Sequence, residues 1–134
     1  MSSTAFSGVS SGPYTIAEYV WSATGLAVDS SFFVAIVTFE VVGITARVDV
    51  AGTDAGAVTA QIRKAPSGTA VASGTLLHTG TINLKGTANT NQTLTLSATP
   101  SDLQLAVGDC IGFDLTGVST AAVGCVTVRL RPTA

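Results

Sequence analysis

Two short segments near the C-terminus constrain the fold of this chain more than any other feature. In residues 111–115 and again in residues 126–130, every second side chain is apolar. A period of two places the apolar side chains on one face of a half-buried β-strand. If the two strands are neighbours in one sheet, Phe113 lies opposite Val126 and both apolar sets face the same core.

The rest of the chain has the same character, with short apolar or alternating runs separated by Gly, Pro, Asn and Asp. A turn is expected at Gly108-Asp109, with the Asp109 carboxylate hydrogen-bonded to the backbone of its own turn. No segment favours a helix longer than one turn. The further strands are expected in residues 14–22, 31–42, 44–50, 57–63, 76–78, 81–84, 91–97 and 103–107.

Many short strands with such turns predict an all-β fold, an antiparallel β-sandwich of the jelly-roll type. The 134 residues fit one domain. Residues 14–134 are expected to form the sandwich. Residues 1–13 are rich in Ser and Gly and are expected to form a flexible, extended N-terminal arm.

Gly-Thr dipeptides recur every six residues from position 68 to position 87. A six-residue period is typical of left-handed β-helices. Such a coil needs several turns to bury its axis, and this repeat covers barely more than one. Hairpin turns within long loops explain the spacing better.

The chain is unusually apolar for a soluble domain. Its mean hydropathy is +0.52 and only 10% of its residues are charged, against roughly 25% in an average domain. Surplus apolar surface usually marks an interface, so we expect a homodimer or homotrimer. The contact is expected at residues 31–42, a run apolar on both faces, which indicates a central strand covered on both sides or one that meets a second subunit. Six candidate contact residues follow from this run and from the arm: Phe33, Val37 and Phe39, together with Phe6, Val9 and Pro13.

Neither a membrane nor a nucleic acid is an expected partner. The most apolar region, residues 32–50, is interrupted by charged side chains and lacks the ~18 uninterrupted apolar residues of a membrane span. The N-terminus does not have the features of a signal peptide, so we expect folding in a cytoplasm. The net charge is −2 and the six Lys and Arg residues are scattered, whereas binding to a phosphate backbone requires clustered cations.

The sequence contains no recognisable catalytic, cofactor-binding or metal-binding motif. His78 is the only histidine, so a histidine metal cluster or a Ser-His-Asp arrangement has no second candidate. We expect His78 to be a solvated surface residue. Cys110 and Cys125 are expected to be free thiols, because cytosolic proteins rarely keep disulfides. The sequence therefore favours a protein that is not an enzyme.

Four segments resemble small structural proteins of tailed-bacteriophage virions. They are residues 61–69 (QIRKAPSGT), 84–87 (LKGT), 103–109 (LQLAVGD) and 124–132 (GCVTVRLRP). The resemblance covers roughly the second half of the chain and is strongest to capsid cement, or decoration, proteins of the jelly-roll type. It implies a homo-oligomer, made in the host cytoplasm, that binds the major capsid protein on the outer surface of the virion without catalysis or a cofactor.

A binding module is the alternative, namely a receptor- or carbohydrate-binding β-sandwich of a phage head or tail fibre. Sugar-binding sandwiches usually display exposed aromatic side chains. Residues 52–99 contain no Trp, Tyr or Phe. This composition favours the structural role.

Overall fold

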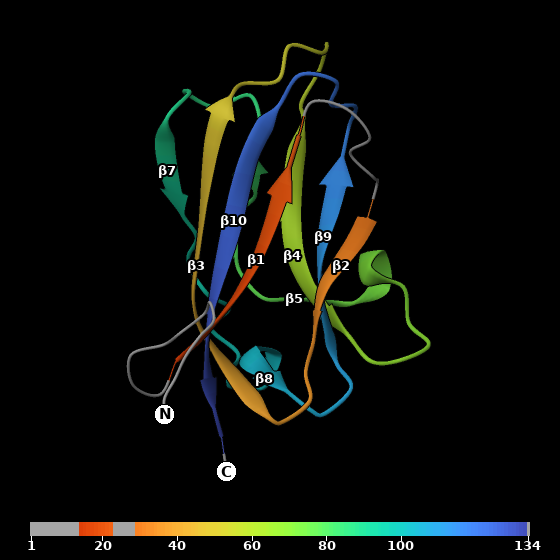
Figure 1. The fold of residues 1–134 in the computed structure, drawn as a ribbon. Coiled ribbons are helices and arrows are strands. Elements are labelled where there is room, and N and C mark those ends of the chain that lie inside the picture. The colour runs from red at the N-terminus through yellow and green to blue at the C-terminus, as the bar shows by residue number, and fades with distance from the viewer. Residues whose placement is uncertain (1–13, 23–28, 134) are drawn as a thin grey trace.

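The computed structural model describes residues 14–22 and 29–133, which form two antiparallel sheets packed face to face (Figure 1). Sheet A has the strand order β1 (Thr15–Trp21), β10 (Val123–Pro132), β3 (Phe39–Val50) and β7 (Thr90–Thr93), with β8 (Gln104–Leu105) paired to β3. Sheet B has the order β2 (Asp29–Val34), β9 (Cys110–Thr116), β4 (Thr59–Ala65) and β5 (Thr75–Leu76), with β6 (Ile82–Asn83) paired to β4. Two 3-10 turns, η1 (Val71–Ser73) and η2 (Pro100–Leu103), complete the described elements.

The strand order confirms the predicted all-β antiparallel sandwich. The chain passes from one sheet to the other after β1, β2 and β3, and again after β6, β8 and β9. In sheet A, for example, the last strand of the chain, β10, lies between the early strands β1 and β3. This interleaving is the jelly-roll arrangement of two Greek keys.

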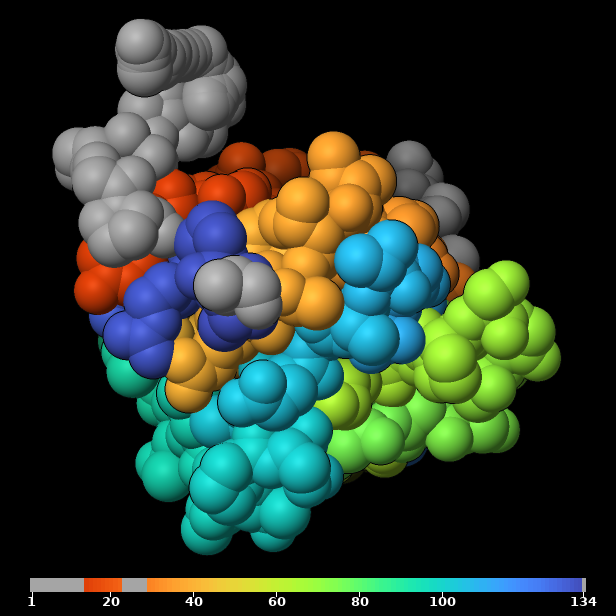
Figure 2. Space-filling view, turned by 90° about the horizontal axis from the view of Figure 1, so that it is seen from below, coloured from red at the N-terminus to blue at the C-terminus, as the bar shows by residue number. Residues whose placement is uncertain are grey.

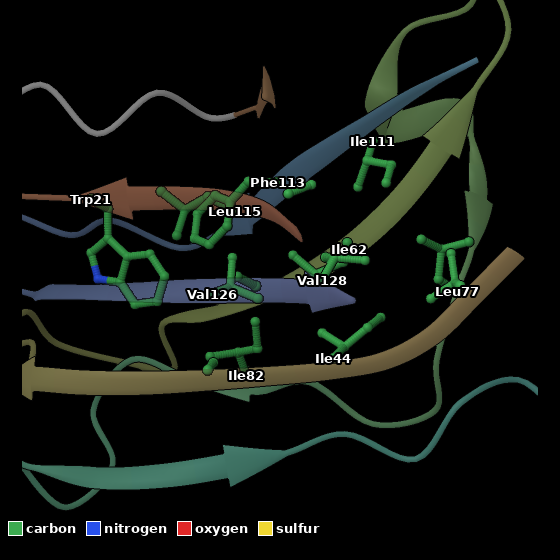
Figure 3. Close-up of a cluster of buried hydrophobic side chains, with 14 of the residues drawn as sticks. Trp21, Ile44, Ile62, Leu77, Ile82, Ile111, Phe113, Leu115, Val126 and Val128 are labelled. Carbon is green, nitrogen blue, oxygen red and sulfur yellow. The ribbon is translucent and has the colours of Figure 1, made fainter. Parts of the chain in front are cut away.

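Alternating side chains build the core between the sheets, as the sequence predicts. On β10, Val126, Val128 and Leu130 are fully buried, while Thr127 and Arg129 point outward. On β9, the alternate apolar residues are likewise buried. Figure 3 shows these side chains converging from both sheets on one cluster.

The predicted register between the last two long strands is wrong. β9 belongs to sheet B and β10 to sheet A. Phe113 lies opposite Ile62 of β4, and Val126 lies between Tyr19 of β1 and Ala46 of β3. Alternation fixes which face of a strand is buried but not which strand is its neighbour. The two side chains still reach one core, from opposite sheets (Figure 3).

The run 31–42 is not one central strand. It contains the end of β2, a loop at 35–38 and the start of β3. The chain crosses here from β2, at the edge of sheet B, to β3 in sheet A. The apolar residues at the start of the run therefore belong to one sheet and those at its end to the other. The expectation of a strand covered on both faces is therefore corrected.

His78 is a buried structural residue, not a solvated one. It is 2% exposed, and its Nε2 accepts a hydrogen bond of 2.9 Å from the Ile62 backbone N–H. Its Nδ1 lies 2.9 Å from the Thr79 carbonyl oxygen. Because Nε2 accepts, the proton is assigned to Nδ1, which donates to Thr79. Burial lowers the pKa of His78, the Thr79 hydrogen bond raises it, and the charge of Arg63 lowers it further.

The imidazole fills a gap in sheet B. β5 pairs with β4 at Arg63 and Lys64, and β6 pairs with β4 at Thr59 and Ala60. The backbone N–H of Ile62 lies between these two short strands. The His78 ring supplies the acceptor that a continuous neighbouring strand would otherwise provide.

Gly124 in β10 occupies a position that has no room for a side chain. A Cβ there would collide with the Arg47 carbonyl oxygen and approach the Trp21 ring to 2.7 Å. We therefore expect Gly124→Ala to lower the free energy of unfolding by about 1–3 kcal/mol. Urea denaturation measures the change.

Gly43→Ala in β3 is the matched control, because its Cβ would meet only the Arg129 side chain at 3.7 Å, an ordinary contact. This variant should unfold within ~0.5 kcal/mol of the wild type, as most substitutions without a clash do. Equal denaturation midpoints for the Gly43 and Gly124 variants would contradict the packing described for Trp21.

Candidate interaction surface

Two loops lie side by side at one end of the sandwich, the end that Figure 2 views directly. One is the 35–38 loop between β2 and β3, and the other is the turn 106–109 between β8 and β9. The Ala35 N–H donates to the Asp109 carbonyl oxygen at 2.8 Å, and the Gly108 N–H donates to the Ala35 carbonyl oxygen at 2.8 Å. These bonds hold the two loops together as one surface.

Four aliphatic side chains on these loops and the end of β2 face solvent, and we call them the apolar tip. Their exposed fractions are 57% for Val34, 82% for Ile36, 46% for Val37 and 65% for Val107. Clustered apolar side chains of this kind are typical of protein interaction sites. The apolar tip is therefore the main candidate contact surface among the described residues.

The turn beneath Val107 is rigidly specified by its sequence. Gly108 has a φ of +93°, a conformation that favours glycine. The Ala106 N–H donates to the Asp109 carboxylate at 2.9 Å, and the Asp109 N–H donates to the Ala106 carbonyl oxygen at 3.0 Å. The predicted role of Asp109 in its own turn is confirmed. The turn holds Val107 outward without help from a partner.

The end of β10 supports the same surface. The Thr133 N–H donates to the Thr38 carbonyl oxygen at 2.9 Å, and the Thr38 hydroxyl donates to the Thr133 carbonyl oxygen at 2.8 Å. These bonds hold the 35–38 loop at Thr38, in addition to the bonds that Ala35 makes with the turn. The apolar tip thus has a backbone braced by three segments that are distant in sequence.

A polar hollow of about 400 Å³ borders the apolar tip. Lys64 lies in it and donates from Nζ to the carbonyl oxygens of Ser101 and Gln104. The hollow is lined by Thr38, Lys64, Ser101, Gln104, Leu105, Ala106, Asp109 and Thr133. An apolar patch with a polar border matches the anatomy of protein–protein interfaces.

The six candidate contact residues from the sequence do not lie on one surface in the part of the chain that the structure describes. Val37 lies in the apolar tip. Phe39 is buried in the core, and the half-buried Phe33 packs edge-to-face on its ring at 5.5 Å. Phe6, Val9 and Pro13 lie outside the described residues.

Sequence reasoning missed Ile36 and Val107, which are the two most exposed members of the apolar tip. A usable signal existed for Val107, because it directly precedes the Gly108-Asp109 turn. Residues at the corner of a tight turn are usually polar, so an aliphatic side chain there is informative.

The described aromatic rings contribute mainly to the core. Phe113 packs against Tyr19 with ring centroids 4.8 Å apart and against Trp21 at 5.2 Å. Tyr19 also packs against Phe32 at 5.6 Å. On β1, Tyr19 and Trp21 lie on the inner face and Val20 lies on the outer face.

Within residues 14–22 and 29–133, no group of three or more His, Cys, Asp and Glu side chains is placed to hold a metal ion. Cys110 and Cys125 are free thiols in different sheets. Burial raises the pKa of Cys125, as do the charges of Glu18 and Asp49. No helix among these residues is long and apolar enough to cross a membrane.

Comparison with protein-family models found no match, and comparison with curated protein sequences found none either. Among solved structures, a chain of the cyanophage Pam1 capsid asymmetric unit is similar in fold. The match covers 97% of this chain and 94% of that chain, with a TM-score of 0.55 and 14% sequence identity. The two chains share a fold over nearly their whole lengths.

Proposed function

We propose that this protein is a structural component of a phage virion, which decorates the outer capsid surface and stabilises the shell by binding the major capsid protein non-covalently. The observation that carries the proposal is the fold shared over 97% of the chain with a chain of a phage capsid asymmetric unit. The resemblance of four sequence segments to decoration proteins supports the same role. In this role the protein acts as an oligomer and has no enzymatic activity.

The apolar tip is the proposed attachment surface. Covering an exposed aliphatic side chain contributes roughly 25 cal/mol per Å² of apolar area removed from water. Ile36 and Val107 have the most area to lose. The loops are already fixed by hydrogen bonds from Ala35 to the turn 106–109, so little conformational entropy is lost on binding.

The polar hollow beside the apolar tip is proposed to set the orientation of the bound protein rather than to add affinity. Thr38 and Asp109 line it and offer hydrogen-bonding groups at the border of the contact. Polar groups at the rim of an interface set its orientation and contribute little affinity. The two surfaces together suit a fixed orientation on a repeating shell.

The alternative of a sugar-binding module receives less support. Sugar recognition on a sandwich uses aromatic faces open to solvent, whereas Trp21 and Phe113 are buried and Tyr19 packs against both. The sole imidazole, His78, is occupied by two hydrogen bonds. The described side chains therefore favour a structural role.

Co-sedimentation with expanded shells stripped of decoration tests the attachment. We expect the wild type to pellet with the shells and the double variant Ile36→Asp/Val107→Asp to bind at least ~10-fold more weakly, because two charges would have to be buried. Val118→Asp is the matched control. Val118 is 63% exposed and follows the opposite end of β9.

The two possible failures have different meanings. If the double variant binds as well as the wild type, the apolar tip is not the attachment surface. If the wild type itself does not pellet with shells, the proposed decoration function is wrong.

A further inference from the structure

β1 is an edge strand of unusual regularity. It pairs with β10 through seven consecutive residue pairs without a register shift, and no other described strand pairs with it. The other sheet edges are protected. β7 has four residues, β5 and β6 have two each, and β2 carries a register shift between Ser31 and Phe33. A long regular edge offers unpaired N–H and C=O groups to another strand.

The outer face of β1 is also incompletely covered. Ile16 is 40% exposed and Val20 is 66% exposed, with Glu18 between them. The strand contains neither lysine nor proline, the residues that commonly protect an edge from pairing. Both its backbone and its side chains are thus suited to a partner strand.

We propose that the β1 edge is the contact between two copies of this chain, which pair their β1 strands antiparallel about a two-fold axis. The pairing joins the two copies of sheet A into one continuous sheet. It is an isologous contact, in which each copy uses the same surface. The inference specifies the oligomer of the proposed function and in that respect rests on it.

The side chains select one register. Residues directly opposite each other in an antiparallel pair must have their side chains on the same face of the sheet. This condition requires the two-fold axis to lie between one residue and the same residue of the partner, and the central candidates for that residue are Ala17, Glu18 and Tyr19. An axis at Glu18 would place two carboxylates directly opposite each other, which is destabilising. An axis at Ala17 places Val20 opposite the partner's Tyr14 and pairs every residue from 14 to 20.

Charge complementarity favours the Ala17 register. In it Glu18 lies opposite the partner's Ile16, whose own cross-strand neighbour on β10 is Arg129. The Arg129 guanidinium lies 5.0 Å from the Tyr14 ring centroid and makes no ion pair with a described residue, and neither does Glu18. Each Glu18 thus approaches the partner's Arg129, and the two-fold axis gives two such pairs in the dimer.

Sedimentation velocity between ~1 and ~100 μM tests the association, because this range covers dissociation constants on the order of micromolar. We expect a monomer–dimer equilibrium for the wild type. Val20 lies opposite the partner's Tyr14, and Arg129 lies over that ring. Val20→Lys therefore adds a positive charge beside the partner's Arg129, and we expect it to raise the dissociation constant at least ~10-fold. Val118→Lys, an equally exposed valine outside β1, should dimerise like the wild type.

A charge exchange tests the register itself. Glu18→Arg and Arg129→Glu should each weaken the dimer, and the double variant should restore it, because the ion pair is rebuilt with its charges reversed. Amide hydrogen exchange of the wild type supplies a readout without substitutions. The backbone N–H groups of β1 that point away from β10 should become more protected as protein concentration rises.

These experiments separate the dimer from capsid attachment. Ile36→Asp/Val107→Asp should remain dimeric while losing shell binding, and Val20→Lys should remain folded while losing dimerisation. A wild type that is monomeric at ~100 μM, a trimer, or a Val20→Lys variant that dimerises normally would overturn the inference. A double charge exchange that fails to restore association would overturn the Ala17 register.

Discussion

Replacing Phe113 by alanine should lower the free energy of unfolding by about 3–5 kcal/mol. Its ring is fully buried and packs against Tyr19 and Trp21 at the centre of the core. Removing it loses the transfer free energy of the ring and leaves a cavity, because strands from both sheets surround the site and cannot collapse inward. Chemical denaturation with urea measures the difference.

Thr127→Ala is the control for this prediction. Thr127 lies on β10 beside the buried Val126, but its side chain is on the outer face of sheet A. We expect a change within ~0.5 kcal/mol, as for most surface substitutions. Comparable losses for the two variants would mean that the inner and outer faces are assigned wrongly.

The faces of the strands could be predicted from sequence, but their partners could not. Alternation correctly placed Phe113 and Val126 in the core. It could not show that these adjacent strands belong to different sheets, because a short connection fits either a hairpin or a crossing between sheets. The same ambiguity explains the run 31–42. A strand buried on both sides and a passage between two sheets both produce continuous apolar sequence.

The candidate site was predictable only in part, for a related reason. Val37, a candidate contact residue from the sequence, is exposed in the apolar tip, whereas Phe39, two residues later, is in the core. The division between them depends on where the loop ends and β3 begins, which propensities do not resolve. Val107 joins the same surface only because Ala35 hydrogen-bonds to the distant turn.

His78 illustrates the limit most clearly. A single histidine in a Thr/Gly-rich loop is typical of a surface residue. Its burial follows from the gap that β5 and β6 leave beside Ile62, and this gap is a property of the folded sheet. The local sequence carries no sign of it.

The buried histidine predicts a stability that decreases on acidification. Burial lowers the pKa of His78 in the folded protein, whereas in the unfolded chain it titrates near its ordinary value of about 6.5. Below that pH the unfolded state binds a proton that the folded state excludes. The stabilisation is therefore fully present above pH ~6.5 and is lost as the pH falls toward the pKa of the folded state.

Burial is the main cause of the lowered pKa, and the hydrogen bond to Ile62 shows what protonation would disrupt. A protonated Nε2 would carry its own hydrogen toward the Ile62 N–H, so the bond cannot survive protonation. Between pH 7.5 and 5 the free energy of unfolding should fall with a limiting slope of about 1.4 kcal/mol per pH unit. Urea denaturation at intervals of half a pH unit measures this slope. As His78 is the only histidine, no other side chain with an ordinary pKa near 6.5 contributes to it.

His78→Gln provides the comparison, because it removes the titrating group while keeping a hydrogen-bonding side chain. At pH 7.5 the variant should be less stable by about 1–3 kcal/mol, since the Ile62 N–H loses a well-placed buried acceptor. The gap between the two proteins should narrow as the pH falls, because only the wild type loses stability by titration at this position. A constant gap from pH 7.5 to 5, or a wild type that gains stability on acidification, would show that the imidazole is not held neutral against the Ile62 backbone.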